Sequence, residues 1–191
     1  ELAGDEVGLA IYDAKAAYQD AFADGGIGSI NQEMAEARRG FEKCLAAEPT
    51  RQECHYFLGL VYSSVKASES YSPEKAKASL RRAPDLPEAH VELARLLRVQ
   101  DDLDAAAREL GVALKLSPQM AVAHLELGIV RKLDGNEDAA VDSLVAAYQA
   151  DRFSATADRA VAELAKIRPD HPLVAGALMI GDVKGDVFST D

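Results

Sequence analysis

The sequence predicts an all-α fold in which antiparallel helix hairpins stack into a superhelical solenoid closed by a C-terminal cap. The main observation is an internal repeat, because residues 87–118 align with residues 121–152 after a shift of 34 positions. Identical residues coincide in this alignment: His90 with His124, Leu93 with Leu127, Ala106 with Ala140, Leu110 with Leu144, and Ala113 with Ala147. Self-similarity at this period is typical of stacked helical hairpins, whose terminal repeats need a cap.

The composition fits a folded helical chain and argues against two classes of partner. Of the 191 residues, 48% are hydrophobic and only 6% aromatic, which suits close-packed helices with alanine-rich seams. The 32 acidic residues outnumber the 21 basic ones, giving a formal net charge of −11. A chain this acidic repels nucleic acid and anionic membrane surfaces. We find no run of 18 apolar residues and therefore expect no transmembrane segment.

The register of these repeats resembles the tetratricopeptide repeat (TPR) family. That family places a Leu-Gly pair in the first helix of each hairpin, and this chain has Leu58-Gly59 and Leu127-Gly128. In the second helix the family has a small residue, a larger apolar residue one turn on, another Ala and a closing Pro, which are matched by Ala106, Leu110, Ala113 and Pro118. The resemblance covers most of the chain. It implies a protein-binding module without naming a biological role.

The repeats divide a single TPR-like domain of residues 1–191. We expect a divergent first repeat at 6–50, a second repeat with a loop insertion at 51–86, regular repeats at 87–120 and 121–154, capping helices at 155–181 and an extended tail at 182–191. Thr50 with Glu53 forms a capping-box pattern at the start of the second repeat, and Asp85 with Glu88 is expected to cap the helix that opens the third.

The TPR resemblance also implies a concave groove lined by the first helix of each hairpin. Carried over by register, its residues are Tyr56, Leu60, Ser63, Val91, Arg95, Arg98, Leu125, Ile129 and Lys132. An apolar strip edged with basic residues would suit an extended or helical peptide that carries carboxylates. The alternative is that Arg95, Arg98 and Lys132 only form ion pairs with glutamates on solvated helix faces.

Three histidines, His55, His90 and His124, occupy the same place in successive repeats. Neighbouring helices stand ~8–10 Å apart, whereas a metal–nitrogen bond needs ~2 Å, so one ion would not reach all three rings. We therefore interpret each histidine as a packing residue with one satisfied ring nitrogen. We predict no metal site and no cofactor.

Two cysteines, Cys44 and Cys54, lie at equal distances on either side of Pro49, which marks a turn between antiparallel helices. Residues placed in this way tend to face each other, so the pair could form a disulfide. The alternative is two buried thiols. A disulfide would indicate a periplasmic or secreted protein and two thiols a cytoplasmic one, so the compartment stays unknown at this stage.

The sequence favours a non-catalytic function, in which the groove holds a peptide or protein segment and the chain acts as an adaptor or assembly factor. Neither a His-Glu-x-x-His nor a Gly-x-Ser-x-Gly motif occurs. Two alternatives stay open. The chain, which begins at Glu1, could be an accessory TPR region of a larger enzyme, such as a bacterial cell-envelope enzyme. It could also be a self-assembling scaffold in which residues 173–180 or the tail dock into the groove of another copy.

Overall fold

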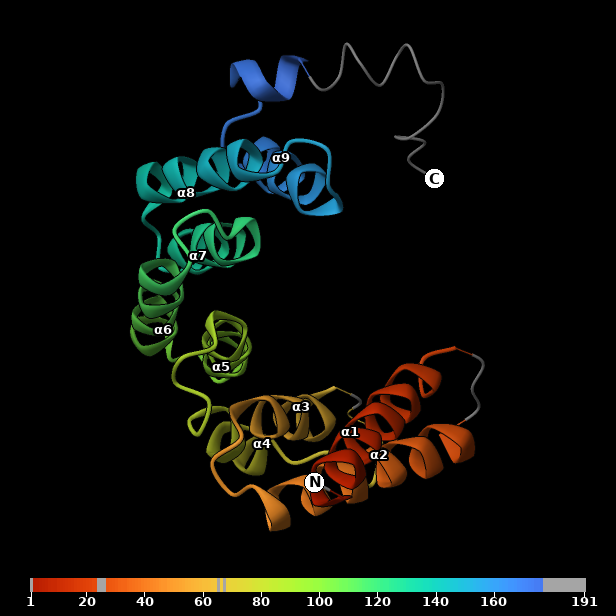
Figure 1. Ribbon diagram of the computed structural model, residues 1–191. Coiled ribbons are helices and arrows are strands. Elements are labelled where there is room, and N and C mark those ends of the chain that lie inside the picture. The colour runs from red at the N-terminus through yellow and green to blue at the C-terminus, as the bar shows by residue number, and fades with distance from the viewer. Residues whose placement is uncertain (1, 24–26, 65, 67, 177–191) are drawn as a thin grey trace. The chain divides into compact units, whose positions relative to one another are not determined.

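The computed structural model describes residues 2–23, 27–64, 66 and 68–176, and within them every regular element is a helix (Figure 1). The helices are α1 (Leu2–Asp20), α2 (Ile27–Ala47), α3 (Gln52–Ser63), α4 (Pro73–Leu80), α5 (Pro87–Val99), α6 (Leu103–Leu116), α7 (Ala121–Leu133), α8 (Glu137–Ala150) and α9 (Ala155–Ile167). A further helical turn follows at 172–176. The predicted all-α class is therefore confirmed.

The helices form two compact units, Glu1–Gln100 (unit 1) and Asp101–Asp191 (unit 2). The boundary falls inside the predicted third repeat, residues 87–120, between α5 and α6. Each unit consequently has its own hydrophobic core.

Unit 1 contains the hairpins α1–α2 and α3–α4, followed by α5 (Figure 1). Helix α2 packs against α3, and α5 packs against both α3 and α4. The core of the first hairpin and α3 includes Met34, Phe41 and Val61, each fully buried, and the Phe41 ring stacks on Phe57 with centroids 5.3 Å apart. Burial of such side chains supplies most of the stability of a helical repeat.

Close approach within a hairpin depends on glycine at two of the predicted Leu-Gly pairs. A Cβ atom added to Gly59 would lie 2.6 Å from Leu80 Cγ, and one added to Gly128 would lie 2.7 Å from Leu144 Cγ. Helices α3 and α7 can therefore approach α4 and α8 only because these positions carry no side chain. This geometry agrees with the register read from the sequence.

Unit 2 is built around the α7–α8 hairpin, against which α6 and α9 pack. The small residues predicted at the seams, Ala106, Ala113, Ala140 and Ala147, are all fully buried. Helix α9 and Val174 cover the core formed by α7 and α8, with Leu173 packed beside them. This packing is the C-terminal cap expected at 155–181, as far as it is described. The part of the cap after residue 176 and the tail at 182–191 lie outside the described residues.

Each of the three repeated histidines hydrogen-bonds to the turn that precedes its helix. The ring Nε2 atom donates to the backbone carbonyl of the proline six residues earlier: His55 to Pro49 at 2.9 Å, His90 to Pro84 at 3.0 Å, and His124 to Pro118 at 2.9 Å. The expected hydrogen bond to one ring nitrogen is thus present in all three, and His55 is also buried. The imidazole closes the turn that leads into α3, α5 and α7.

Two helix starts differ from the sequence-based prediction. The N-cap residue of α3 is Arg51 and that of α5 is Leu86, and neither side chain accepts a capping hydrogen bond. Thr50 and Asp85 therefore do not cap these helices. Asp85 instead bonds to Gln52, accepting from Gln52 Nε2 at 2.6 Å and donating its N–H to Gln52 Oε1 at 2.8 Å. This contact, which no local pattern reveals, links the start of α3 to the turn before α5.

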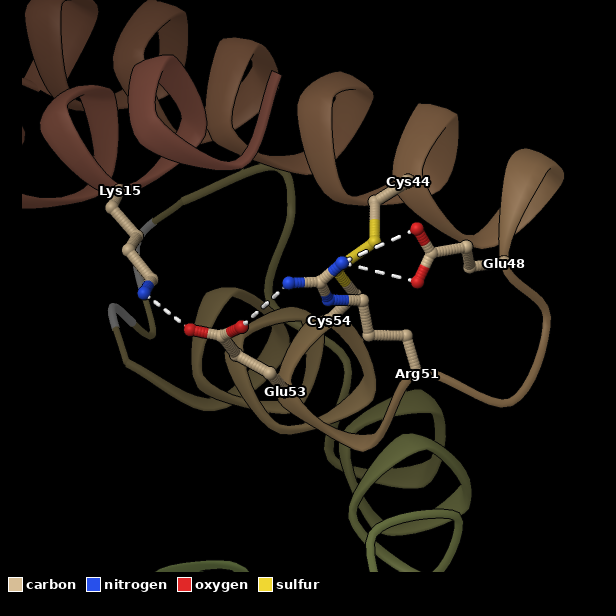
Figure 2. A network of polar contacts seen from close by, with 6 residues as sticks. All are labelled: Lys15, Cys44, Glu48, Arg51, Glu53 and Cys54. Carbon is tan, nitrogen blue, oxygen red and sulfur yellow. Dashed lines mark hydrogen bonds and ion pairs between the residues drawn. A yellow bond between two sulfur atoms is a disulfide. The ribbon is translucent and has the colours of Figure 1, made fainter. Parts of the chain in front are cut away.

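A disulfide joins the first hairpin of unit 1 to the second (Figure 2). It connects Cys44 near the end of α2 to Cys54 near the start of α3, with the Cα atoms 6.5 Å apart, and both cysteines are fully buried. Because the bridge crosses the α2–α3 turn, it holds the end of α2 close to the start of α3.

An ion-pair network lies beside the disulfide and ties α1 into the same junction (Figure 2). Glu53 pairs with Lys15 of α1 and with Arg51 at 3.5 Å, while Arg51 also contacts Glu48 at 3.0 Å. The hydrogen bond from Lys15 is the main cause that lowers the pKa of Glu53, and burial opposes it. The ionised form of Glu53 is thus the one that the folded protein stabilises.

We predict that Gly128→Ala lowers the free energy of unfolding by ~1–3 kcal/mol, because the new methyl group would force Leu144 out of its buried position. Gly111→Ala in α6 is the matched control, since a Cβ there meets nothing within 4 Å. That substitution should stabilise the helix by ~0.5–1 kcal/mol. Urea unfolding followed by circular dichroism measures both, and equal midpoints for the two variants would contradict the proposed hairpin contact.

We predict that the intact mass measured without reductant is lower by two hydrogens than the mass of the reduced chain. Because the bridged cysteines are separated by 10 positions, reduction should cost about 2–3 kcal/mol of unfolding free energy. The Cys44→Ala/Cys54→Ala double variant is the control, and its urea midpoint should not respond to reductant. An unchanged mass on reduction would show that the native protein holds two thiols.

We predict that Glu53→Gln destabilises the protein at pH 7 by about 0.5 kcal/mol, a value kept small because the side chain is partly exposed. Since the folded-state pKa of Glu53 is lowered, its contribution is present above the usual carboxyl pKa and is lost as the pH falls through the folded-state value. Urea midpoints of the two proteins should therefore converge in acid. In the Lys15→Met background the same substitution should have little further effect, and a full effect there would refute the pairing.

Candidate functional site

An open hollow of about 490 Å³ lies in unit 1 between the end of α1, α3 and α5. From α1 and the turn after it come Tyr18 and Phe22, and from α3 come Tyr56, Leu60 and Ser63. From α5 come Glu92, Arg95, Leu96 and Val99, and from the segment between α3 and α4 come Ser64, Lys66 and Tyr71. Four aromatic rings therefore line one concave surface of an aromatic-poor chain.

Helical spacing explains how these side chains reach the same surface. Tyr56, Leu60 and Ser63 are four and three positions apart, so they lie on one face of α3. Tyr18 and Phe22 are four positions apart and their rings meet edge to face, with centroids at 5.3 Å. The Tyr18 hydroxyl and Ser64 Oγ lie 2.7 Å apart and share a hydrogen bond, which ties α1 to the end of α3.

The aromatic wall is partly buried yet accessible. Phe22 is 55% exposed and Val99 is 64% exposed, so the rim presents apolar surface to solvent. Burial, assisted by the carboxylates of Glu92 and Glu88, raises the pKa of Tyr56 to about 12. Burial likewise raises the pKa of Tyr18. Both phenols therefore stay protonated at neutral pH and can act as hydrogen-bond donors.

The charge in the hollow is nearly balanced. Arg95 Nη1 lies 2.6 Å from Glu92 Oε1, one turn away on α5. Arg95 therefore forms an ion pair on its own helix, as the alternative interpretation predicted. Lys66 is exposed at the rim and supplies a second cation. The hollow is therefore mainly an aromatic surface with mixed charge at its edge.

The structure divides the nine predicted groove residues into three groups. Tyr56, Leu60, Ser63 and Arg95 line the hollow of unit 1. By contrast, Val91, Leu125 and Ile129 are only 2%, 2% and 7% exposed and belong to the packing between helices. The prediction that these three line a groove is therefore wrong, and they are core residues. The register places them on the first helix of a hairpin, but neighbouring helices cover the face that carries them.

The remaining predicted residues serve other contacts. Arg98 is half-buried on α5 and does not line the hollow. Lys132 of α7 forms an ion pair with Glu163 of α9. Burial would raise the pKa of Glu163, but hydrogen bonds from Lys132 and Lys166 outweigh it and lower this pKa. Lys132 therefore fastens the cap to the α7–α8 hairpin.

Sequence reasoning missed Tyr18, Phe22 and Tyr71 as lining residues. The helical spacing of Tyr18 and Phe22 is also compatible with core positions. The two residues are accessible because they lie at the end of α1 and in the turn after it. Tyr71 lies in the loop inserted between α3 and α4, where no periodic pattern exists. An excess of aromatic residues near the ends of the first and third helices was the available signal.

In residues 2–23, 27–64, 66 and 68–176, His, Cys, Asp and Glu do not gather into any group of three suited to a metal ion. None of the helices described there combines the length and the apolar character needed to cross a bilayer.

Comparison with known proteins supports the fold. No family model and no curated protein matches the sequence. Solved structures do match. PilF of Pseudomonas aeruginosa has a TM-score of 0.75 at 15% identity, over 100% of this chain and 80% of that one. MamA has a TM-score of 0.61 at 23% identity, over 82% and 91%.

YrrB, described as a TPR protein with an unusual peptide-binding site, has a TM-score of 0.53 at 18% identity, over 94% of this chain and 98% of its own. Identities this low carry information about fold alone. Together with the repeat register and the hairpin contacts, they show that this chain has the tetratricopeptide repeat fold.

Proposed function

We propose that this protein is a non-catalytic interaction module and that the hollow of unit 1 holds a segment of a partner protein. The observation that supports the proposal is the cluster of Tyr18, Phe22, Tyr56 and Tyr71 around an open concave surface. Aromatic side chains in a partly desolvated depression are typical anchors of protein interfaces.

The lining suggests the chemistry of the segment that binds. An apolar or aromatic side chain of the partner would pack between Tyr56, Leu60 and Phe22, where it displaces water from already apolar walls. The phenol hydroxyls would donate to backbone carbonyls of the segment. Because Arg95 is paired with Glu92, only Lys66 is placed to attract a carboxylate. A strongly acidic partner would be repelled by the net charge of −11, so one carboxylate beside an apolar anchor fits best.

Two further observations agree with this proposal. The structurally similar protein YrrB carries a peptide-binding site, which shows that the fold can support one. The Cys44–Cys54 disulfide favours an oxidising compartment, so we place the partner in the periplasm or outside the cell.

The test uses random peptides displayed on phage and selected on the immobilised wild-type protein. We expect the enriched peptides to share an aromatic or aliphatic residue. Their affinity for Tyr56→Ala should fall by about 10–100-fold, since that substitution removes a central ring of the hollow. Isothermal titration calorimetry with the enriched synthetic peptides measures the change.

The matched control is Tyr148→Ala, which removes a half-buried tyrosine from α8 in unit 2. It should bind the selected peptides as the wild type does. Circular dichroism establishes that both variants keep their helical content. Peptides that bind wild type and Tyr56→Ala equally would show that the hollow is not the binding site.

A further inference from the structure

A second hollow, of about 500 Å³, lies along the groove between α1 and α2 and shares no lining residue with the first. The residues that define this α1–α2 face are Glu6, Leu9 and Asp13 from α1, and Arg39, Gly40 and Lys43 from α2. Leu9 is 61% exposed in this groove, and Tyr12, one turn further along α1, is 71% exposed. Leu9 therefore adds exposed apolar surface to a groove whose edges carry charged side chains.

Gly40 fixes the register of the two helices. A Cβ atom added to it would lie 2.5 Å from Ala14 Cβ and 3.0 Å from the backbone oxygen of Ala10. Because α1 and α2 are antiparallel, this contact places Arg39 level with Asp13. Lys43 lies one turn further on, level with Leu9.

In this register the two edges of the groove carry opposite charge. Glu6 and Asp13 lie on the α1 edge, and Arg39 and Lys43 lie on the α2 edge. Glu36 also lines the α2 edge, where its carboxylate is 3.9 Å from Arg39, one turn away. Both side chains of this pair are exposed, so Arg39 stays accessible to a second carboxylate.

We infer that the α1–α2 face binds the same face of a second copy of this chain. A two-fold axis parallel to the helices lays α1 of one copy over α2 of the other. Rotation about this axis leaves the position of each residue along the helix axis unchanged. Asp13 of each copy then meets Arg39 of the other, and Glu6 lies within reach of Lys43. The acidic and basic edges therefore match twice in one interface, while Leu9 of each copy packs against the aliphatic part of Lys43 of the other.

The size of the face sets the strength of this association. Helices of 19 and 21 residues give a face about 28 Å long and ~20 Å wide, or ~560 Å² per copy. A total of ~1,100 Å² is below the ~1,600 Å² of a standard stable interface. We therefore expect the association to be reversible.

Sedimentation velocity of the full chain, over about 1–500 μM, tests the inference. The wild type should show a concentration-dependent monomer–dimer equilibrium. Asp13→Arg and Arg39→Asp should each weaken it by about tenfold or more, since each places like charges opposite one another twice. An equimolar mixture of these two variants should dimerise as well as the wild type, because each chain then presents the charge that the other lacks.

The control is Asp104→Arg, which reverses an exposed charge on α6 of unit 2 and should leave the equilibrium unchanged. Tyr56→Ala should also leave it unchanged, which separates this inference from the proposed peptide site. A wild type that is monomeric throughout the series would overturn the inference. The inference would also be overturned if the mixture of the two variants associated no better than each variant alone, however well either variant folds.

Discussion

The close contact between the two helices of each hairpin is the constraint on which the rest of the structure depends. Gly59 lies against Leu80 and Gly128 lies against Leu144, at positions where even a methyl group would collide with a buried leucine. The sides of α3 and α7 that carry these glycines therefore pack against the second helix of the same hairpin. Tyr56, Leu60 and Ser63 lie on the adjoining side of α3, about 40–100° around the helix from Gly59, and this side lines the hollow. The packing requirement thus decides which residues remain available to bind a partner.

The hollow also depends on a wall that does not belong to the same hairpin. Tyr18 and Phe22 come from the first hairpin, which has to be held at a fixed angle to α3. The covalent bridge from α2 to α3 and the ion pair between Lys15 and Glu53 both restrain this junction. A hydrogen bond between Tyr18 and Ser64 adds a third attachment at the rim. The polar contacts of the junction therefore preorganise an apolar surface, which lowers the entropic cost of binding.

Repeat periodicity was sufficient to predict the fold, because a Leu-Gly pair and seam alanines such as Ala106 and Ala140 meet one steric requirement at fixed intervals. It could not predict exposure. Leu125 and Ile129 have the register of groove residues, yet neighbouring helices bury them, and only the three-dimensional packing shows which face a neighbour covers. Asp85 was assigned to a helix cap but bonds to Gln52, a contact between residues far apart in sequence. Tyr71 was missed because inserted loops carry no period.

Helix α1 takes part in both surfaces of unit 1 without conflict. Leu9 precedes Tyr18 by nine positions, which at about 100° per residue places the two side chains on opposite sides of the helix. Contact between two copies through Leu9 would consequently leave the hollow beside Tyr18 open in both. A pair of copies would then present two hollows, and a partner with two suitable segments would bind far more tightly than either hollow alone allows. Weak self-association and a modest aromatic site are therefore compatible parts of one scaffold.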